Sequence, residues 1–193
     1  PWCWVTARWV VDEVAPARDL SITWQPISLK LKNKPEEDSP FYEPVNRTYK
    51  MLRVMESVRA TEGEQAVFDL YWEYGRRIHH DQAFEFPIED ALESVGLPTS
   101  HAAAFDSEDF DLEIQTRHDQ GIALAGEDIG TPIIAFDNRE GVKQAYFGPV
   151  ITRVPSTEDS LAMWDALVAM MNIDGFWELK RTRTERPEFG DRP

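Results

Sequence analysis

The residue best suited to chemistry is Cys3, the only cysteine of the chain, which follows directly on Pro1 and Trp2. The segment after it, WVTARWVVDEVA, has apolar residues at the spacing of one helical face, so Cys3 stands where a helix begins. Unpaired N–H groups and the positive end of a helix stabilise a thiolate at such a position. Pro1 and Trp2 fit the spacer positions of a Cys-x-x-Cys redox motif, so we expect thiol chemistry here and a further cysteine directly before Pro1. An ordinary buried thiol is the alternative, because a lone cysteine usually behaves as a small apolar residue.

The elements that must position this motif are mostly helices. The first is expected over Trp4–Ala15 and ends at Pro16, which cannot continue it. A charged, proline-rich linker, KLKNKPEEDSPFYEP, begins at Lys30 and leads into a helical block. The helices expected in this block are Tyr49–Ala60, Glu64–Ile78, Pro87–Val95 and one marked by Phe110, Ile114 and Ile122, with Ser107 as its candidate N-cap.

Alternating or continuous apolar runs predict three strands. The first is Leu20–Leu29, LSITWQPISL, although Pro26 weakens it beyond its first half. The other two are Gly130–Asp137 and Val142–Thr152, which flank the turn residues NREG as a β-hairpin. A final helix is expected to open at Ser156, in a pattern close to a capping box.

The resulting order is helix, strand, helical block, hairpin and helix. This is the order of an α/β, thioredoxin-like fold of the DsbA type with a large helical insertion, its first strand missing from the chain. We expect residues 1–30 and 130–193 to form the thioredoxin-like domain and residues 31–129 to form the helical insertion subdomain.

That fold adds candidate residues to the motif. A cis-proline precedes the third strand of a thioredoxin-like fold and faces the cysteines, and Thr131-Pro132 in IGTP occupies this position. We therefore expect Thr131 and Pro132 to contact substrate close to Cys3. Asn33 and Tyr42 follow the expected strand, where the insertion begins, and we include them as substrate-binding candidates.

The other polar residues carry weaker signals. His79 and His80 are adjacent, whereas metal-binding pairs on a helix prefer i, i+4 spacing, so a solvated helix end is favoured and no metal site is expected. His118 shares the apolar row of its helix and is interpreted as a structural histidine. The basic run Lys180, Arg181 and Arg183 near the end of the chain is interpreted as a solvated tail.

Composition narrows the class of protein. The 193 residues carry 35 acidic and 20 basic side chains, and the net charge of -15 disfavours nucleic-acid and anionic-membrane partners. No apolar run approaches the roughly 18 residues of a membrane span, and no signal peptide is visible. One cysteine excludes an internal disulfide framework and is compatible with a reducing cytosol.

Four segments together resemble the DsbA-like family of mycothiol-dependent nitroreductases: PWCWVTARWV, GTPIIAF, YFGPVITRVP and GFWELKRTRTERPEF. The resemblance covers nearly the whole chain and is weakest in the helical block. It implies a Cys-Pro-Trp-Cys motif in which the first cysteine attacks and the second, Cys3 here, resolves the mixed disulfide. The sequence contains only that second cysteine, so the attacking thiol is absent from it.

The resemblance also implies an activity and its partners. The expected function is that of a cytoplasmic thiol-disulfide oxidoreductase, with mycothiol as the thiol cosubstrate and disulfides or nitro compounds as acceptors, and with no tightly bound cofactor. A kappa-type glutathione transferase or hydroxychromene carboxylate isomerase is one alternative, and a non-enzymatic acidic binding module is another. The Pro-Trp-Cys spacer argues against the first alternative, and the reactivity of Cys3 discriminates the second. The oligomeric state is left open.

Overall fold

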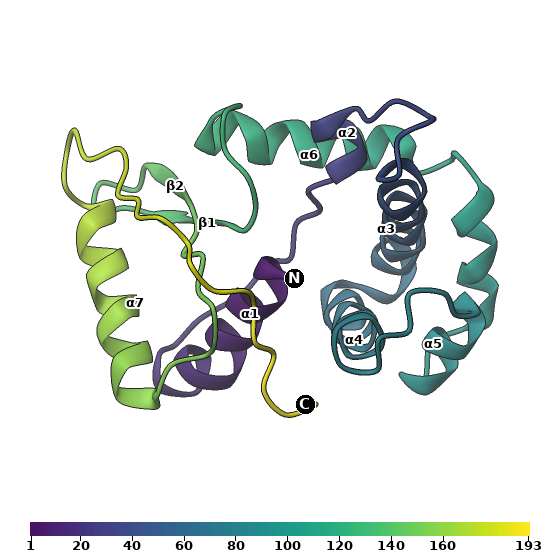
Figure 1. Cartoon of the computed structure of the whole chain (residues 1–193), viewed down its shortest axis with the longest axis horizontal. Helices are drawn as coiled ribbons and strands as arrows, with labels where there is room; N and C mark the ends of the chain where they lie inside the picture. The colour runs from purple at the N-terminus through teal and green to yellow at the C-terminus, as the bar shows by residue number, and fades with distance from the viewer. The chain divides into compact units, whose positions relative to one another are not determined.

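The computed structural model describes residues 1–193 and shows a helix-dominated α/β protein with one two-stranded sheet (Figure 1). The chain divides into two compact units, Pro1–Ser21 with Ile122–Pro193 and Ile22–Gly121. The sequence predicts the first boundary after residue 30 and the second after residue 129, and both lie earlier in the structure, after Ser21 and after Gly121. The assignment of one part as a thioredoxin-like domain and the other as an insertion stays a prediction, because compactness alone does not identify a domain's fold.

The first unit opens with α1, Trp2–Arg8, directly at the Pro-Trp-Cys motif. The helix continues through a π-helical segment, Trp9–Val14, and ends in a single 3₁₀ turn, Ala15–Ala17. The predicted helix over Trp4–Ala15 is thus confirmed, with two more residues at each end. It forms because its apolar face is buried: Trp9 and Val14 are both fully inaccessible.

The sheet of the first unit is the predicted hairpin. Strand β1, Ile133–Asp137, pairs antiparallel with β2, Lys143–Phe147, and Ile133 lies opposite Phe147. Asn138 builds the turn, because its side-chain oxygen accepts hydrogen bonds from the backbone N–H of Glu140 at 3.0 Å and of Val142 at 2.9 Å. Both strands are shorter than expected, since β2 ends where Gly148-Pro149 interrupts the ladder.

The last helix, α7, covers Thr157–Met171 and completes the core of this unit. Its N-cap is Ser156, whose hydroxyl accepts a hydrogen bond from the N–H of Asp159 at 3.3 Å, as the capping pattern predicts. Trp164 on α7 lies 6.0 Å from Trp9 and 5.8 Å from Phe136 between ring centroids. One face of the hairpin is therefore packed against α7 and the π-helical segment.

The second unit contains helices and their connecting segments but no strand. The expected helices are all present, with different ends, and one short helix and one 3₁₀ segment are additional. In chain order they are α2 (Leu29–Asn33), α3 (Tyr42–Glu62), α4 (Glu64–Gly75), a π-helical Arg76–His80, α5 (Ile88–Ser94), a 3₁₀ segment (Thr99–Asp106) and α6 (Asp111–Ala125), whose last turn belongs to the first unit. None of the helices is long and apolar enough to cross a bilayer.

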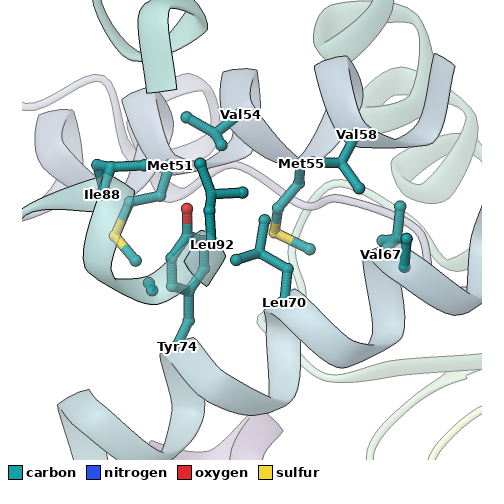
Figure 2. Close-up of a cluster of buried hydrophobic side chains, with 11 residues drawn as sticks. Met51, Val54, Met55, Val58, Val67, Leu70, Tyr74, Ile88 and Leu92 are labelled. Carbon is teal, nitrogen blue, oxygen red and sulfur yellow. The ribbon is translucent and has the colours of Figure 1, made fainter. Parts of the chain in front are cut away.

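The core of the second unit lies between α3, α4 and α5 (Figure 2). Val54, Leu70 and Leu92 are completely inaccessible, and burying each such side chain is worth about 1.5–3 kcal/mol. Gly63 permits the sharp passage from α3 to α4, because its φ of 88° is a conformation that other residues rarely adopt.

Two sequence predictions in this part are wrong. The segment Leu20–Leu29 contains no strand, because a strand needs a neighbour for its backbone groups and β1 and β2 pair only with each other. Its end instead begins α2, since the side chain of Ser28 accepts the N–H of Leu31 at 3.2 Å. Ser107 does not cap α6, which starts at Asp111, and its hydroxyl accepts the N–H of Asp109 instead.

Candidate functional site

The site is built around Cys3 in the first turn of α1, where it is a free, half-buried thiol. Burial raises the pKa of Cys3, because the thiolate loses the solvation that water would give it. A hydrogen bond from the side chain of Thr131 to the sulfur opposes this and lowers the pKa, but burial is the larger effect. At neutral pH Cys3 is therefore mainly a thiol, with one hydroxyl donor in place for its thiolate.

Thr131 reaches Cys3 from the entry to the hairpin. The Thr131-Pro132 peptide bond is cis, as the sequence predicts, and it directly precedes β1. The carbonyl of Pro132 accepts a hydrogen bond from the N–H of Gly148 at 2.8 Å, which closes the open end of the hairpin. Two segments that are distant in the chain, the start of α1 and the entry to β1, thus meet at the cysteine.

Thr6 joins α1 to the segment that follows β2 and was not anticipated from the sequence. Its side chain is 2% exposed, and its hydroxyl contacts the carbonyl of Pro149 at 2.8 Å and that of Trp2 at 3.2 Å. The first contact joins α1 to the end of β2, and the second lies within the first turn of α1. A polar residue on the buried face of a helix is the only sequence signal that could have identified Thr6.

The Gly148-Pro149 bond is also cis and was not anticipated as part of the site. Gly148 has a φ of 111°, and a Cβ added there would meet the backbone nitrogen of Val150 at 3.2 Å. Glycine is therefore required for the backbone to turn away from β2 and present the Pro149 carbonyl to Thr6.

The remaining predicted site residues are placed as follows. Trp2 is half-buried and Pro1 is exposed, both at the start of α1. Asn33 is the last residue of α2 and Tyr42 the first of α3, so both belong to the second unit. Nothing in the structure tests their contact with substrate, and they stay predictions.

The histidines of the second unit have structural surroundings. His118 is 5% exposed and accepts the backbone N–H of Ser28 at its Nδ1, with a donor-to-acceptor distance of 3.3 Å. Burial lowers its pKa, so the ring is neutral and serves as an acceptor, which confirms its structural interpretation. His79 and His80 end the π-helical segment and are half-buried rather than fully solvated. No group of three or more potential ligand side chains that could hold a metal ion is present.

A serine, a histidine and a glutamate also meet in the second unit. The hydroxyl of Ser57 lies 2.8 Å from Nδ1 of His101, and the Nε2 atom of His101 lies 3.6 Å from the carboxylate of Glu62. The second distance is too long for a hydrogen bond, so no carboxylate orients the ring as nucleophilic catalysis requires. The cluster joins α3 to the 3₁₀ segment and is structural.

A comparison with known families gives a match over most of the chain. A family model described as Rv2466c-like, mycothiol-dependent nitroreductase Rv2466c, matches residues 1–181. The match includes the whole arrangement around Cys3, from α1 through both cis-prolines to the end of α7.

Proposed function

Because the chain belongs to the Rv2466c-like family of mycothiol-dependent nitroreductases, which are oxidoreductases, we propose that Cys3 carries out thiol–disulfide exchange with mycothiol. The observation that supports this most is the hydrogen bond from the side chain of Thr131 to the sulfur of Cys3. A hydroxyl donor aimed at a sulfur favours the thiolate, which is the form that attacks a disulfide.

The fold that we propose for the first unit is thioredoxin-like, of the DsbA type. Support comes from a cysteine in the first turn of α1, a cis-proline directly before β1, and an antiparallel hairpin followed by α7. These are the parts that the fold uses to place a thiol beside an extended backbone segment. The second unit then corresponds to the helical insertion.

In the proposed mechanism, Cys3 acts as a resolving thiol. It loses its proton to water, and its thiolate attacks a mixed disulfide at the sulfur that is bonded to the sulfur of mycothiol. A new S–S bond to Cys3 forms, the old S–S bond breaks, and the departing mycothiol thiolate takes up a proton from water. Because burial raises the pKa of Cys3, the Thr131 hydroxyl assists by donating to the thiolate as it forms.

The overall reaction balances with a nitro compound as acceptor. Two mycothiol molecules supply two electrons and two protons and leave as one disulfide. The nitro group accepts them, becomes a nitroso group and releases one water. With a disulfide as acceptor, the same electrons and protons yield two thiols. The proposed partners are thus a small thiol and a small oxidised substrate, and the proposed compartment is a reducing cytosol. The proposed binding residues are Pro1, Trp2, Thr131, Pro132, Asn33 and Tyr42.

The alternatives have less support. Membership of an oxidoreductase family leaves the non-enzymatic binding module without an observation in its favour. A kappa-type transferase would bind the small thiol without exchanging disulfides, and it would not need a donor on the sulfur of Cys3.

Trapping Cys3 with oxidised mycothiol tests the proposal. The natural full-length protein is incubated with mycothiol disulfide, and digestion with mass spectrometry follows the peptide that carries Cys3. We expect a disulfide at Cys3 that added mycothiol removes. A Cys3 peptide that stays a free thiol at every concentration of mycothiol disulfide would contradict the proposal.

A further inference from the structure

The C-terminal segment after α7 has no helix or strand, but it is held along the first unit at both ends. At its start, the hydroxyl of Tyr146 donates to the carbonyl of Phe176 at 2.8 Å. Further along, Arg153 donates to Glu185 at 2.8 Å and to Glu188 at 2.7 Å, and these two ion pairs lie at the surface. The segment between Phe176 and Glu185 is therefore fixed at both sides.

The end of this segment is attached to α1 itself. Arg8 donates from its Nη1 to the carbonyl of Asp191 at 3.1 Å and to that of Phe189 at 3.3 Å. The N–H of Glu188 donates to the carbonyl of Thr152 at 2.7 Å. Figure 1 shows the segment, in yellow, leaving α7 and running past the hairpin to α1. The C-terminal segment is thus hydrogen-bonded to the helix that carries Cys3.

Within this segment, Arg183 lies on the ring of Trp2, with 5.2 Å from the guanidinium carbon to the ring centroid. Arg183 is exposed and takes part in none of the ion pairs. The neighbouring carboxylate, Glu185, is occupied by Arg153 and does not neutralise it. The guanidinium therefore rests on the residue before Cys3 with its N–H donors unpaired, in a stretch whose other cations are Lys180, Arg181 and Arg186.

We infer that Arg183 determines acceptor specificity by binding a negatively charged, two-oxygen group, such as a carboxylate, on the electron acceptor at the Cys3 motif. The guanidinium is planar and presents paired donors that match two oxygens in one plane. The stacking contact with Trp2 holds it in one place before the acceptor arrives. This inference rests on the proposed function, because it concerns the substrate of that same site.

The charge of the protein explains why such a residue is needed. The net charge of -15 repels a small anion over the whole surface. In physiological salt this field is screened within about 8 Å, so a local cation decides the potential where the acceptor binds. Mycothiol is uncharged, so its binding does not require Arg183, and the residue discriminates only between acceptors.

Two acceptors that differ in one charge separate this role from a structural one. Mycothiol-dependent reduction of 4-nitrobenzoate and of the neutral 4-nitrobenzamide is measured in the natural full-length protein and in Arg183→Gln, Arg183→Lys and Arg181→Gln. We expect Arg183→Gln to raise KM for 4-nitrobenzoate about tenfold, because the variant loses one exposed charge-assisted pair with the carboxylate. The KM for 4-nitrobenzamide and both kcat values should stay unchanged. Arg183→Lys should recover part of the loss, because it keeps the charge without the paired donors.

Arg181→Gln is the matched control, because Arg181 is also exposed and lies two residues before Arg183. This variant removes the same charge and should leave both KM values unchanged. If Arg183→Gln changed KM equally for 4-nitrobenzoate and 4-nitrobenzamide, the inference would be overturned, because Arg183 would then only position Trp2. An unchanged KM for 4-nitrobenzoate would overturn it as well.

A binding measurement keeps this test separate from the proposed function. If the natural protein reduces neither acceptor with mycothiol, the proposed function fails, and calorimetry of 4-nitrobenzoate binding still tests Arg183. A dissociation constant about tenfold higher in Arg183→Gln than in Arg181→Gln supports the inference. Equal dissociation constants overturn it.

Discussion

The side chain of Thr131 hydrogen-bonds to the sulfur of Cys3, so the entry to β1 and the first turn of α1 meet at the reactive atom. Burial and this hydrogen bond act on the thiol in opposite directions, and burial has the larger effect on the pKa. Cys3 is thus mainly a protonated thiol at neutral pH, and the Thr131 hydroxyl stabilises the thiolate when it forms.

The first prediction concerns the ionisation of Cys3. Because the pKa is raised, the thiolate fraction at pH 7 is small and increases only as pH rises above the pKa of a free cysteine. Thr131→Val removes the donor and should raise the pKa further, whereas Thr131→Ser keeps the hydroxyl and should leave it unchanged. The measurement is the alkylation rate of the Cys3 peptide against pH, followed by mass spectrometry. A midpoint that is the same in Thr131→Val and in the unchanged protein would show that the hydrogen bond has no effect on the thiol.

The second prediction concerns Thr6, which connects α1 to the carbonyl of Pro149. Thr6→Val keeps the volume but leaves that carbonyl without its donor, and we expect a loss of about 1–3 kcal/mol in the free energy of unfolding. Thr6→Ser keeps the hydroxyl and should lose less. Urea unfolding measures both variants, and equal stability of Thr6→Val and the unchanged protein would exclude this role for Thr6.

The sequence predicted the parts of the site that depend on local patterns. The hairpin was predictable because Asn138 and the glycine at the turn have strong local preferences, and the helix after Cys3 was predictable from its apolar face. Thr131-Pro132 could be placed because the order of elements positions it before β1.

The other features depend on contacts between distant residues. The segment Leu20–Leu29 has the alternation of a strand but no partner for its backbone, and a partner cannot be deduced from the segment itself. Thr6 acquires its role only through Pro149, and Arg183 through Trp2. Neither pair has a local signal, so these contacts could not be predicted from the sequence.

The third prediction tests the core of the second unit. The hydroxyl of Tyr74 is buried without a hydrogen-bond partner, and Figure 2 shows it directed into the apolar cluster. Burial also raises the pKa of Tyr74, which keeps the phenol neutral at all physiological pH values. Tyr74→Phe removes an unpaired polar atom and keeps the ring, so we expect unchanged stability or a gain of up to about 1 kcal/mol.

Tyr49→Phe is the matched control for Tyr74→Phe, because the hydroxyl of Tyr49 hydrogen-bonds to Asp111. We expect this variant to lose about 1–3 kcal/mol, since a bond to a charged group is removed. Urea unfolding compares the two variants. A larger loss for Tyr74→Phe than for Tyr49→Phe would mean that the hydroxyl of Tyr74 has a partner in solution.

The fourth prediction concerns Gly148. Its φ of 111° is unfavourable for any side chain, and an added Cβ would meet the nitrogen of Val150 at 3.2 Å. We expect Gly148→Ala to lose more than about 1 kcal/mol of stability. Gly141→Ala is the comparison. Gly141 also has a positive φ, 75°, but no atom lies within 4 Å of its added Cβ, so its loss of stability should be smaller. Thermal unfolding measures both variants, and a smaller loss for Gly148→Ala would contradict the packing seen at the end of β2.

The most direct test of the central proposal is mycothiol-dependent turnover of a nitro compound by the natural full-length protein, compared with Cys3→Ser. The hydroxyl of serine has nearly the volume of the thiol but forms no disulfide, so the variant keeps the contacts of α1 and loses the exchange. We predict that turnover coupled to mycothiol oxidation falls to the background rate in Cys3→Ser, while its free energy of unfolding stays within about 1 kcal/mol of that of the unchanged protein. Full turnover by Cys3→Ser with mycothiol would contradict the proposal that Cys3 carries the exchange.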